Sequence, residues 1–360
     1  MSGLRAAVEG ALAASLLNLP VGVQRVLAGT PVVLDGQTLA PETQLLLRLA
    51  RISGGPDSTK LSLEDGRRQM SRQAQLVGGR QHIGATRDLV VDGAEGPLPA
   101  RLYVPTQRLG GGLRPTMMFL HGGGMMQGDL DSHDAACRFL AERSGVQLLA
   151  VDYRLAPEHP FPAAVDDCAA AYAWLVRHAA DLHADPDRLA VGGDSAGGYL
   201  SATTAILAAE RGLPMAFQLL VYPCTDFVER SRSRDLFGSG FFLTREFMDL
   251  AERNYFRAAA DREDPLASIL RRKDFPDGLA PAHVVTAGFD PLRDEGEAYA
   301  EVLEGHRVAV TRVRLASMIH GFFNMVGCGH EPPSYVAAIA ERLRDALDHR
   351  AQPSGRSAGA

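Results

Sequence analysis

The chain has 360 residues, of which 46% are hydrophobic and 22% charged, and its formal net charge is −6. This length allows one large hydrophobic core with a smaller appendage, and the small acidic charge gives no basis for nucleic-acid binding. No stretch approaches the roughly 18 uninterrupted apolar residues of a membrane-spanning helix, and the four scattered cysteines predict neither a zinc site nor a disulfide framework.

The N-terminal region has a helical pattern. Its apolar segment 10–19 raises the question of a signal peptide, but Glu9 precedes it and no clear small-residue cleavage site follows, so we expect a helix of a cytoplasmic protein. Helical spacing is clearest in residues 41–50, and the polar residues 54–59 resemble a linker. We therefore predict a helical cap segment over residues 1–60.

Strand and helix patterns alternate through the middle of the chain. Residues 86–91 and 98–104 predict a hairpin that enters a sheet. Further strands are predicted at 116–120, 147–152, 188–192, 217–222, 282–287 and 309–314. Helices are predicted at 131–143, 163–179, 196–210, 293–304 and 334–348. Such alternation predicts an α/β fold with a mostly parallel central sheet flanked by helices.

One segment, from about 226 to 264, interrupts this alternation. Its charged and aromatic residues are mixed, as in residues 240–250, and we predict an inserted helical lid. The catalytic domain is then predicted over residues 84–350, with the insertion as a second part of the cap. Residues 351–360 are small and polar, and they predict a disordered tail.

Ser195 lies in the pentapeptide Gly193-Asp-Ser-Ala-Gly197, between a predicted strand and a predicted helix. The flanking glycines allow the sharp turn that presents a serine hydroxyl, and the amide of Ala196 would lie at the start of the helix. About 0.2 matches to this pattern are expected by chance in such a chain, so the motif needs support from other residues.

That support comes first from the tetrapeptide His121-Gly-Gly-Gly124, which follows the predicted strand 116–120. Acyl transfer builds negative charge on an oxygen, and preorganised N–H donors stabilise that charge. A glycine loop can bring its amides close enough to supply such donors. We interpret His121 as an anchor of this loop rather than as a base.

A serine nucleophile also needs a base, and the base needs an acid that fixes its tautomer. His320 is the predicted base, in a loop shortly after the last predicted strand, where Gly321 leaves room beside the ring. Asp290 is the predicted acid because it follows the predicted strand 282–287. Both side chains would lie at the carboxyl ends of strands, where open α/β sheets form their sites.

Other residues compete for these roles or invite other functions. The alternative acids are Asp226 and Asp294, and the alternative histidines are His283, His306 and His330. Asp166 and Asp167 could suggest a metal site, but no His or Cys lies at ligand spacing, and we expect helix-start or buried salt-bridge roles instead. Structural roles are also expected for Asp194, Glu158 and His159. No metal or cofactor is expected.

Together these motifs resemble the hormone-sensitive-lipase family of bacterial esterases, also called family IV. The resemblance spans roughly residues 84–350 and rests on residues 121–124, 152–160, 193–197, 290–296 and 320–322. It implies an α/β-hydrolase fold with a helical cap, and carboxylesterase activity on short to medium acyl chains. By motif position it implies Ser195 as nucleophile, His320 as base and Asp290 as acid. The implied oxyanion donors are Gly123, Gly124 and Ala196.

The chain departs from the family pattern near the motifs. Members often have an aromatic residue after the glycine triplet, where this chain has Met125 and Met126, and commonly asparagine where it has Tyr199. These three residues and Phe322 form a predicted substrate pocket, although a methionine pair is as often plain packing.

The predicted function is hydrolysis of small-molecule esters through a Ser-His-Asp acyl-enzyme mechanism. A lipase and an amidase or peptidase are alternatives that use the same triad. A ligand-binding receptor on this scaffold, similar to the plant gibberellin receptors, would lack the catalytic histidine, so His320 argues against it. A homodimer through the sheet edge is expected from the resemblance alone, without nucleic acid or stable membrane insertion.

Overall fold

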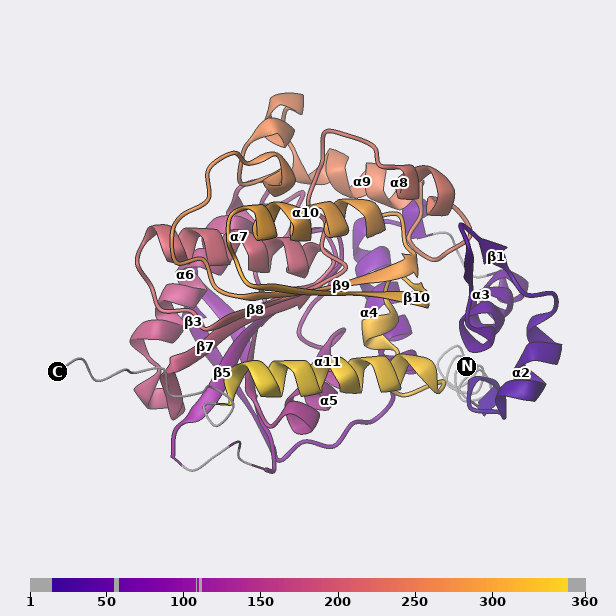
Figure 1. Cartoon of the computed structure of the whole chain (residues 1–360), viewed down its shortest axis with the longest axis horizontal. Coiled ribbons are helices and arrows are strands. Elements are labelled where there is room, and N and C mark those ends of the chain that lie inside the picture. Colours follow the sequence, from indigo (N-terminus) through magenta and orange to yellow (C-terminus); the bar gives the residue numbers. More distant parts are fainter. Residues whose placement is uncertain (1–14, 55–57, 108, 110–111, 349–360) are drawn as a thin grey trace.

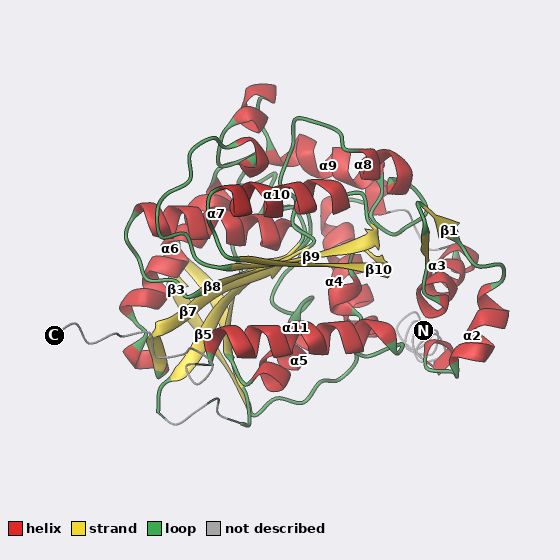
Figure 2. Cartoon of the chain, in the orientation of Figure 1, coloured by secondary structure: helices red, strands yellow, loops and turns green. Residues whose placement is uncertain are grey.

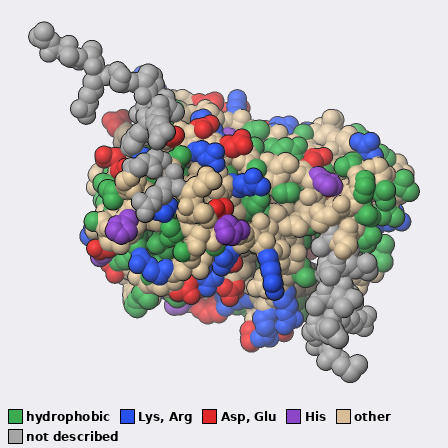
Figure 3. All heavy atoms as spheres, turned by 90° about the horizontal axis from the view of Figure 1, so that it is seen from below, with side chains coloured by type: hydrophobic (Ala, Val, Ile, Leu, Met, Phe, Trp, Pro, Cys, Tyr) green, Lys and Arg blue, Asp and Glu red, His purple; other side chains and the backbone are tan. Residues whose placement is uncertain are grey.

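The computed structural model describes residues 15–54, 58–107, 109 and 112–348, so the predicted tail at 351–360 lies outside the described residues. An eight-stranded sheet lies at the centre, with helices on both faces (Figure 1 and Figure 2). Its strand order is β10-β9-β8-β7-β5-β6-β4-β3. Positive and negative side chains are interspersed over the face shown in Figure 3, as expected from the small net charge.

Parallel pairing dominates the sheet. Its strands are β3 (Ala85–Asp92), β4 (Pro97–Val104), β5 (Arg114–Leu120), β6 (Gln147–Val151), β7 (Ala184–Asp194), β8 (Phe217–Val221), β9 (Ala282–Phe289) and β10 (Val310–Ile319). Only the β3–β4 and β4–β6 pairs are antiparallel among these described strands. The predicted hairpin and the predicted mostly parallel sheet are therefore confirmed.

Helices cover both faces of the sheet. On one face lie α6 (Ala163–Arg177), α7 (Ala196–Glu210) and α10 (Arg293–Gly305), and on the other lie α5 (Asp134–Ser144) and α11 (Glu331–Leu347) (Figure 2). Each face has its own hydrophobic core cluster. Strands β6, β8 and β9 are buried along their whole length, which explains their mainly apolar sequences.

The last strand is longer than its sequence predicted. The expected strand 309–314 continues to Ile319, with a register shift between Leu315 and Ile319 where it pairs with β9. This shift leaves residues 316–318 out of the regular pairing with β9, so the strand pattern of residues 309–314 does not continue through them. His320 therefore follows the strand directly, and the expected intervening loop is wrong.

The N-terminal region packs against the sheet end at which β9 and β10 finish (Figure 1). It contains α2 (Val21–Ala28), the short strands β1 (Val33–Leu34) and β2 (Gln37–Thr38), and α3 (Pro41–Ser53). The Gln37 side chain donates to the carbonyl oxygen of Gly288 at 3.1 Å. Buried Glu42 accepts the backbone N–H groups of His330 and Glu331 at 2.8 and 2.6 Å. The domain boundaries at residues 60 and 84 stay predictions.

A further helix, α4 (Leu63–Gly78), lies in the interval that the predicted boundaries left unassigned. Ser62 caps it by accepting the N–H of Asp65 at 3.1 Å. The insertion after β8 contains α8 (Arg232–Phe237) and α9 (Arg245–Tyr255), so its predicted helical character is present. None of the helices in the described ranges is long and apolar enough to cross a membrane.

Candidate active site

Ser195 occupies a sharp turn between β7 and α7, with φ of 56°. A Cβ atom at Gly193 or Gly197 would collide with the carbonyl oxygen of Leu120, so only glycine allows the turn to approach β5 so closely. Ser195 is also the only residue of the stretch 189–200 that is not fully buried. The turn therefore leaves the serine side chain partly exposed between the buried end of β7 and the buried start of α7.

The three predicted triad residues lie together. The His320 Nδ1 atom is 2.8 Å from Asp290 Oδ2, and His320 Nε2 is 2.9 Å from Ser195 Oγ. Because an ionised carboxylate can only accept a hydrogen bond, Nδ1 carries the proton and Nε2 is free to accept the serine proton. Asp290 is fully buried, and its other oxygen accepts the N–H of Leu292 at 2.8 Å. The acid is thus fixed by its own turn.

The competing residues have other partners. Asp294 accepts the N–H of Ser233, and Asp226 accepts the N–H of Val228. The alternative histidines His283, His306 and His330 contact Thr311, Val302 and Leu19 respectively. The geometry therefore brings only Asp290 and His320, of these described candidates, into line with Ser195.

The glycine loop is held on two sides. The His121 Nδ1 atom lies 2.9 Å from the carbonyl oxygen of Gly122, and the Gly122 N–H donates to Asp194 Oδ1 at 3.0 Å. In a trans peptide the C=O and N–H groups point in opposite directions, so holding the Gly122 carbonyl directs the Gly123 N–H the other way. Among the described residues, no hydrogen bond takes up the N–H groups of Gly123, Gly124 or Ala196. These amides are available as donors.

His121 holds this loop as a neutral side chain. Burial, together with the charge of His133, lowers the pKa of His121 to about 4. The ring stacks on Tyr153 at a centroid distance of 4.3 Å, and the Tyr153 hydroxyl donates to the His121 carbonyl oxygen at 2.7 Å. Since a carbonyl oxygen only accepts, the neutral ring carries its proton on Nδ1. The sequence interpretation of His121 as a loop anchor agrees with these contacts.

Asp194 connects the serine turn to the glycine loop. Burial raises the pKa of this carboxyl group, but His133 at 3.1 Å and the Gly122 N–H outweigh burial and lower the pKa below its ordinary value. Asp194 is therefore a buried carboxylate. The Tyr222 hydroxyl donates to it at 3.4 Å, and the Tyr222 ring lies 4.4 Å from the His320 ring.

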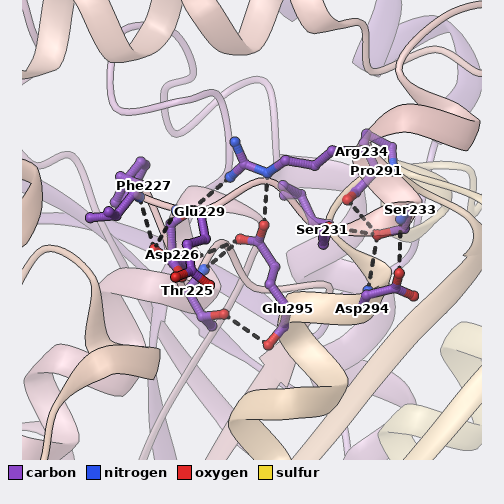
Figure 4. Close-up of polar contacts among 12 residues, drawn as sticks. Thr225, Asp226, Phe227, Glu229, Ser231, Ser233, Arg234, Pro291, Asp294 and Glu295 are labelled. Carbon is purple, nitrogen blue, oxygen red and sulfur yellow. Dashed lines mark hydrogen bonds and ion pairs between the residues drawn. The ribbon is translucent and has the colours of Figure 1, made fainter.

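The insertion is fastened to the chain segment that follows Asp290 (Figure 4). The Arg234 Nε atom donates to Glu295 Oε2 at 2.9 Å, and the Ser233 N–H donates to Asp294 Oδ2 at 2.8 Å. The Ser233 hydroxyl donates to the carbonyl oxygen of Pro291 at 2.8 Å. Helix α8 is thus joined to the turn that carries the acid.

The N-terminal region reaches the same turn. Buried Arg293 forms an ion pair with Asp35 at 2.9 Å and donates to the carbonyl oxygen of Gly288 at 3.2 Å. Asp35 also pairs with Arg232 of α8 at 2.7 Å. The sequence analysis missed these roles of Arg293, Asp294 and Glu295. The sequence feature that could have indicated these roles is the run of three charged residues, 293–295, at the start of a predicted helix that packs on the core.

The four predicted pocket residues lie inside the protein. Met125 is 2% exposed, and Met126, Tyr199 and Phe322 are 0% exposed. The Tyr199 hydroxyl donates to the carbonyl oxygen of Leu266 at 2.7 Å, and Phe322 packs edge-on against Tyr222. Little of their surface is left for a substrate, and their role stays a prediction.

The acidic pair on α6 has the structural role expected from the sequence. Asp167 is buried, pairs with Arg154 at 2.7 Å and accepts the N–H of Ala94 at 2.9 Å. Asp166 lies in the first turn of the helix. In the described ranges, no three His, Cys, Asp or Glu side chains cluster so as to hold a metal ion.

The serine turn, the aligned histidine and acid at neighbouring strand ends, and the loop of available N–H groups define an α/β hydrolase. Comparisons with known proteins agree. Residues 117–324 match a family model described as the alpha/beta hydrolase fold. The carboxylic ester hydrolase LipN of Mycobacterium tuberculosis is 44% identical, over 86% of this chain and 84% of its own.

Two further relatives extend the comparison. Ethyl acetate hydrolase of Pseudomonas putida is 38% identical, over 80% of this chain and 91% of its own. A solved hyperthermophilic esterase from Pyrobaculum calidifontis superimposes with a TM-score of 0.80 at 35% identity, covering 85% of this chain and 98% of its own. The chain belongs to the hormone-sensitive-lipase-like esterases, family IV, of the α/β-hydrolase superfamily. The predicted family, fold and class of ester-hydrolysing enzyme are confirmed.

Proposed function

We propose that this ester hydrolase is a carboxylesterase that acts on small-molecule esters with short to medium acyl chains through a covalent Ser195 intermediate. The observation that carries the proposal is the position of His320, 2.9 Å from Ser195 Oγ and 2.8 Å from Asp290 Oδ2. The names of the relatives LipN and ethyl acetate hydrolase support ester substrates.

The mechanism has two steps. His320 Nε2 takes the Ser195 proton as Ser195 Oγ attacks the ester carbonyl, and the N–H groups of Gly123, Gly124 and Ala196 donate to the developing oxyanion. Collapse of this intermediate releases the alcohol, which receives the proton from His320. Water then attacks the acyl-enzyme by the same route, with His320 again as base, and releases the carboxylic acid. Buried Asp290 stabilises the imidazolium in both steps.

A substitution of the nucleophile tests this proposal. Ser195→Ala is expected to fold like the wild type but to lose nearly all hydrolysis of p-nitrophenyl acetate and butyrate. Ser334→Ala is the control, because this exposed serine on α11 donates to the carbonyl oxygen of His330, away from the site, and its loss should leave the rates unchanged. Turnover retained by a folded Ser195→Ala enzyme would refute the assignment.

The alternatives differ in their substrates. Rates that rise past about C10 acyl chains and jump at emulsion interfaces would favour a lipase, and cleavage of p-nitroanilides at comparable rates would favour an amidase. A receptor without activity is disfavoured because His320 is present and aligned with Ser195.

A cytoplasmic location and a homodimer are the remaining proposals. Strand β10 lies at the edge of the sheet and is exposed over residues 311–314, which supports pairing through this edge. Sedimentation of the purified protein tests the dimer, and fractionation of the native cells tests the location.

A further inference from the structure

Two aromatic side chains of the insertion lie against the backbone of the catalytic loops. A Cβ atom built on Gly124 would lie 3.4 Å from the Phe247 ring, so this ring covers the glycine loop. A Cβ atom built on Gly321 would lie 2.8 Å from the Phe242 ring, so this second ring covers the residue after His320. The insertion therefore places one ring beside the proposed oxyanion donors and another beside the proposed base.

The two positions differ in which part of an ester they meet. His320 must give its proton to the departing alcohol oxygen, so the alcohol part of the substrate lies on the His320 side of the reacting carbonyl. The oxyanion lies on the side of the glycine loop. Phe242, which contacts Gly321, is thus on the alcohol side.

Phe242 is unusual in its exposure and its backbone. Its side chain is 59% exposed, whereas its neighbour Leu243 is only 8% exposed and Phe241 packs against Phe289 at 5.3 Å. Its φ of 77° lies in the left-handed region that residues with a Cβ atom avoid. Residues on strained backbone cluster at active sites and ligand clamps, where the surrounding structure compensates for the strain.

The backbone around Phe242 is fixed at both ends. On one side α8 is joined to the acid turn through Ser233 and Arg234 (Figure 4). On the other side Thr244 caps α9 by accepting the N–H of Phe247 at 3.2 Å, and the Arg245 N–H donates to the carbonyl oxygen of Gly238 at 2.8 Å. The backbone that carries the Phe242 ring is therefore held in place relative to His320.

We propose that Phe242 determines specificity for the alcohol part of the ester. Its ring makes the enzyme favour esters of aromatic alcohols over esters of small aliphatic alcohols. The free face of its ring offers an apolar surface on which an aromatic leaving group packs next to His320. This inference rests on the proposed function, because it needs His320 to protonate the leaving alcohol.

The test compares two esters with the same acyl group, benzyl butyrate and ethyl butyrate. Phe242→Ala is expected to lower kcat/KM for benzyl butyrate about fivefold and to leave that for ethyl butyrate nearly unchanged. Phe242→Tyr keeps the ring and should keep the benzyl-to-ethyl ratio, and Phe242→Leu keeps apolar bulk without the ring and should lower it. Ile52→Ala, at a 71% exposed position on α3, is the control.

If Phe242→Ala leaves the benzyl-to-ethyl ratio of kcat/KM unchanged, the proposed role of Phe242 is overturned. Hydrolysis of these esters by the wild type would still uphold the proposed function. Wild-type enzyme that hydrolyses neither butyrate ester nor p-nitrophenyl butyrate would overturn both together. The two failures are therefore distinguishable.

Discussion

Asp194 accepts the backbone N–H of Gly122 at 3.0 Å, so the residue next to the proposed nucleophile holds the loop that carries the proposed oxyanion donors. The His133 ring lies 3.1 Å from the same carboxylate oxygen. The serine and the donors are thus placed by one buried carboxylate, and their relative position depends on it.

Asp194→Ala is expected to lower kcat by about 10- to 100-fold with little change in KM, because the displaced donors act on the transition state rather than on the bound ester. Asp194→Asn keeps an oxygen that accepts the Gly122 N–H and should lose less. Steady-state kinetics on p-nitrophenyl butyrate measure both variants, and thermal unfolding checks that they fold. A rise in KM at constant kcat would contradict this role.

His121 is expected to affect catalysis by fixing the orientation of the peptide bond between Gly122 and Gly123. His121→Ala frees the Gly122 carbonyl, so the Gly123 N–H is less well aimed and kcat should fall by about tenfold. His121→Asn offers a side-chain N–H near the position of Nδ1 and should recover part of the loss. Equal kcat values for the two variants would show that the hydrogen bond to Gly122 does not position the donor.

His283 should make stability depend on pH. Burial, together with the charge of Arg342, lowers its pKa to about 4 in the folded protein, whereas an unfolded histidine has a pKa of about 6.5. Between these values the unfolded chain binds the extra proton, so the free energy of unfolding falls as pH drops from 6.5 to 4. The contribution approaches about 3 kcal/mol at pH 4.

His283→Gln removes this proton uptake and should show a smaller fall in the free energy of unfolding over the same range. Urea denaturation at pH 6.5, 5.5 and 4.5 measures the difference. Some pH dependence should persist in the variant, because the pKa of His121 is also lowered to about 4. Parallel curves for variant and wild type would contradict the assignment to His283.

The Arg234–Glu295 pair should show strong coupling. Both side chains are buried, and Arg234 also contacts Glu252 at 3.2 Å. Arg234→Met leaves buried carboxylates without their cation and should destabilise the protein by about 3–5 kcal/mol. Glu295→Gln removes one of these charges and still accepts the N–H of Thr225, so the double variant should recover part of the loss. Additive changes in a urea-denaturation cycle would refute the coupling.

The proximity of the candidate site residues was predictable from the sequence, because a tight turn, a glycine loop and strand ends each impose residue types at short range. Ser195, Asp290 and His320 were found in this way. The end of β10 was not, because the strand shifts register between Leu315 and Ile319, and such an irregularity interrupts the alternating pattern by which a strand is recognised. Helix α4 was missed because its sequence is mainly polar.

The surface on which a substrate rests could not be predicted from the motifs. Met125, Met126, Tyr199 and Phe322 are near the motifs in sequence, but packing of the core buries them. Phe242 is far from every motif, and only the folding of the insertion brings it to Gly321. Which side chain stays exposed depends on contacts between segments that are distant in the sequence, and these contacts cannot be inferred from a single sequence.

Arg67 on α4 donates to the carbonyl oxygens of Met126 and Ala156 at 2.8 and 3.0 Å and pairs with Glu158 at 2.8 Å. These contacts make α4 a support of the chain segment that follows the glycine loop. A shortened protein that starts at β3 would lack this support. If the cap of a related esterase replaced the cap of this protein, the replacement would have to keep an arginine at the position of Arg67. Without it, the exchange would change the rate of hydrolysis as well as the substrate selectivity.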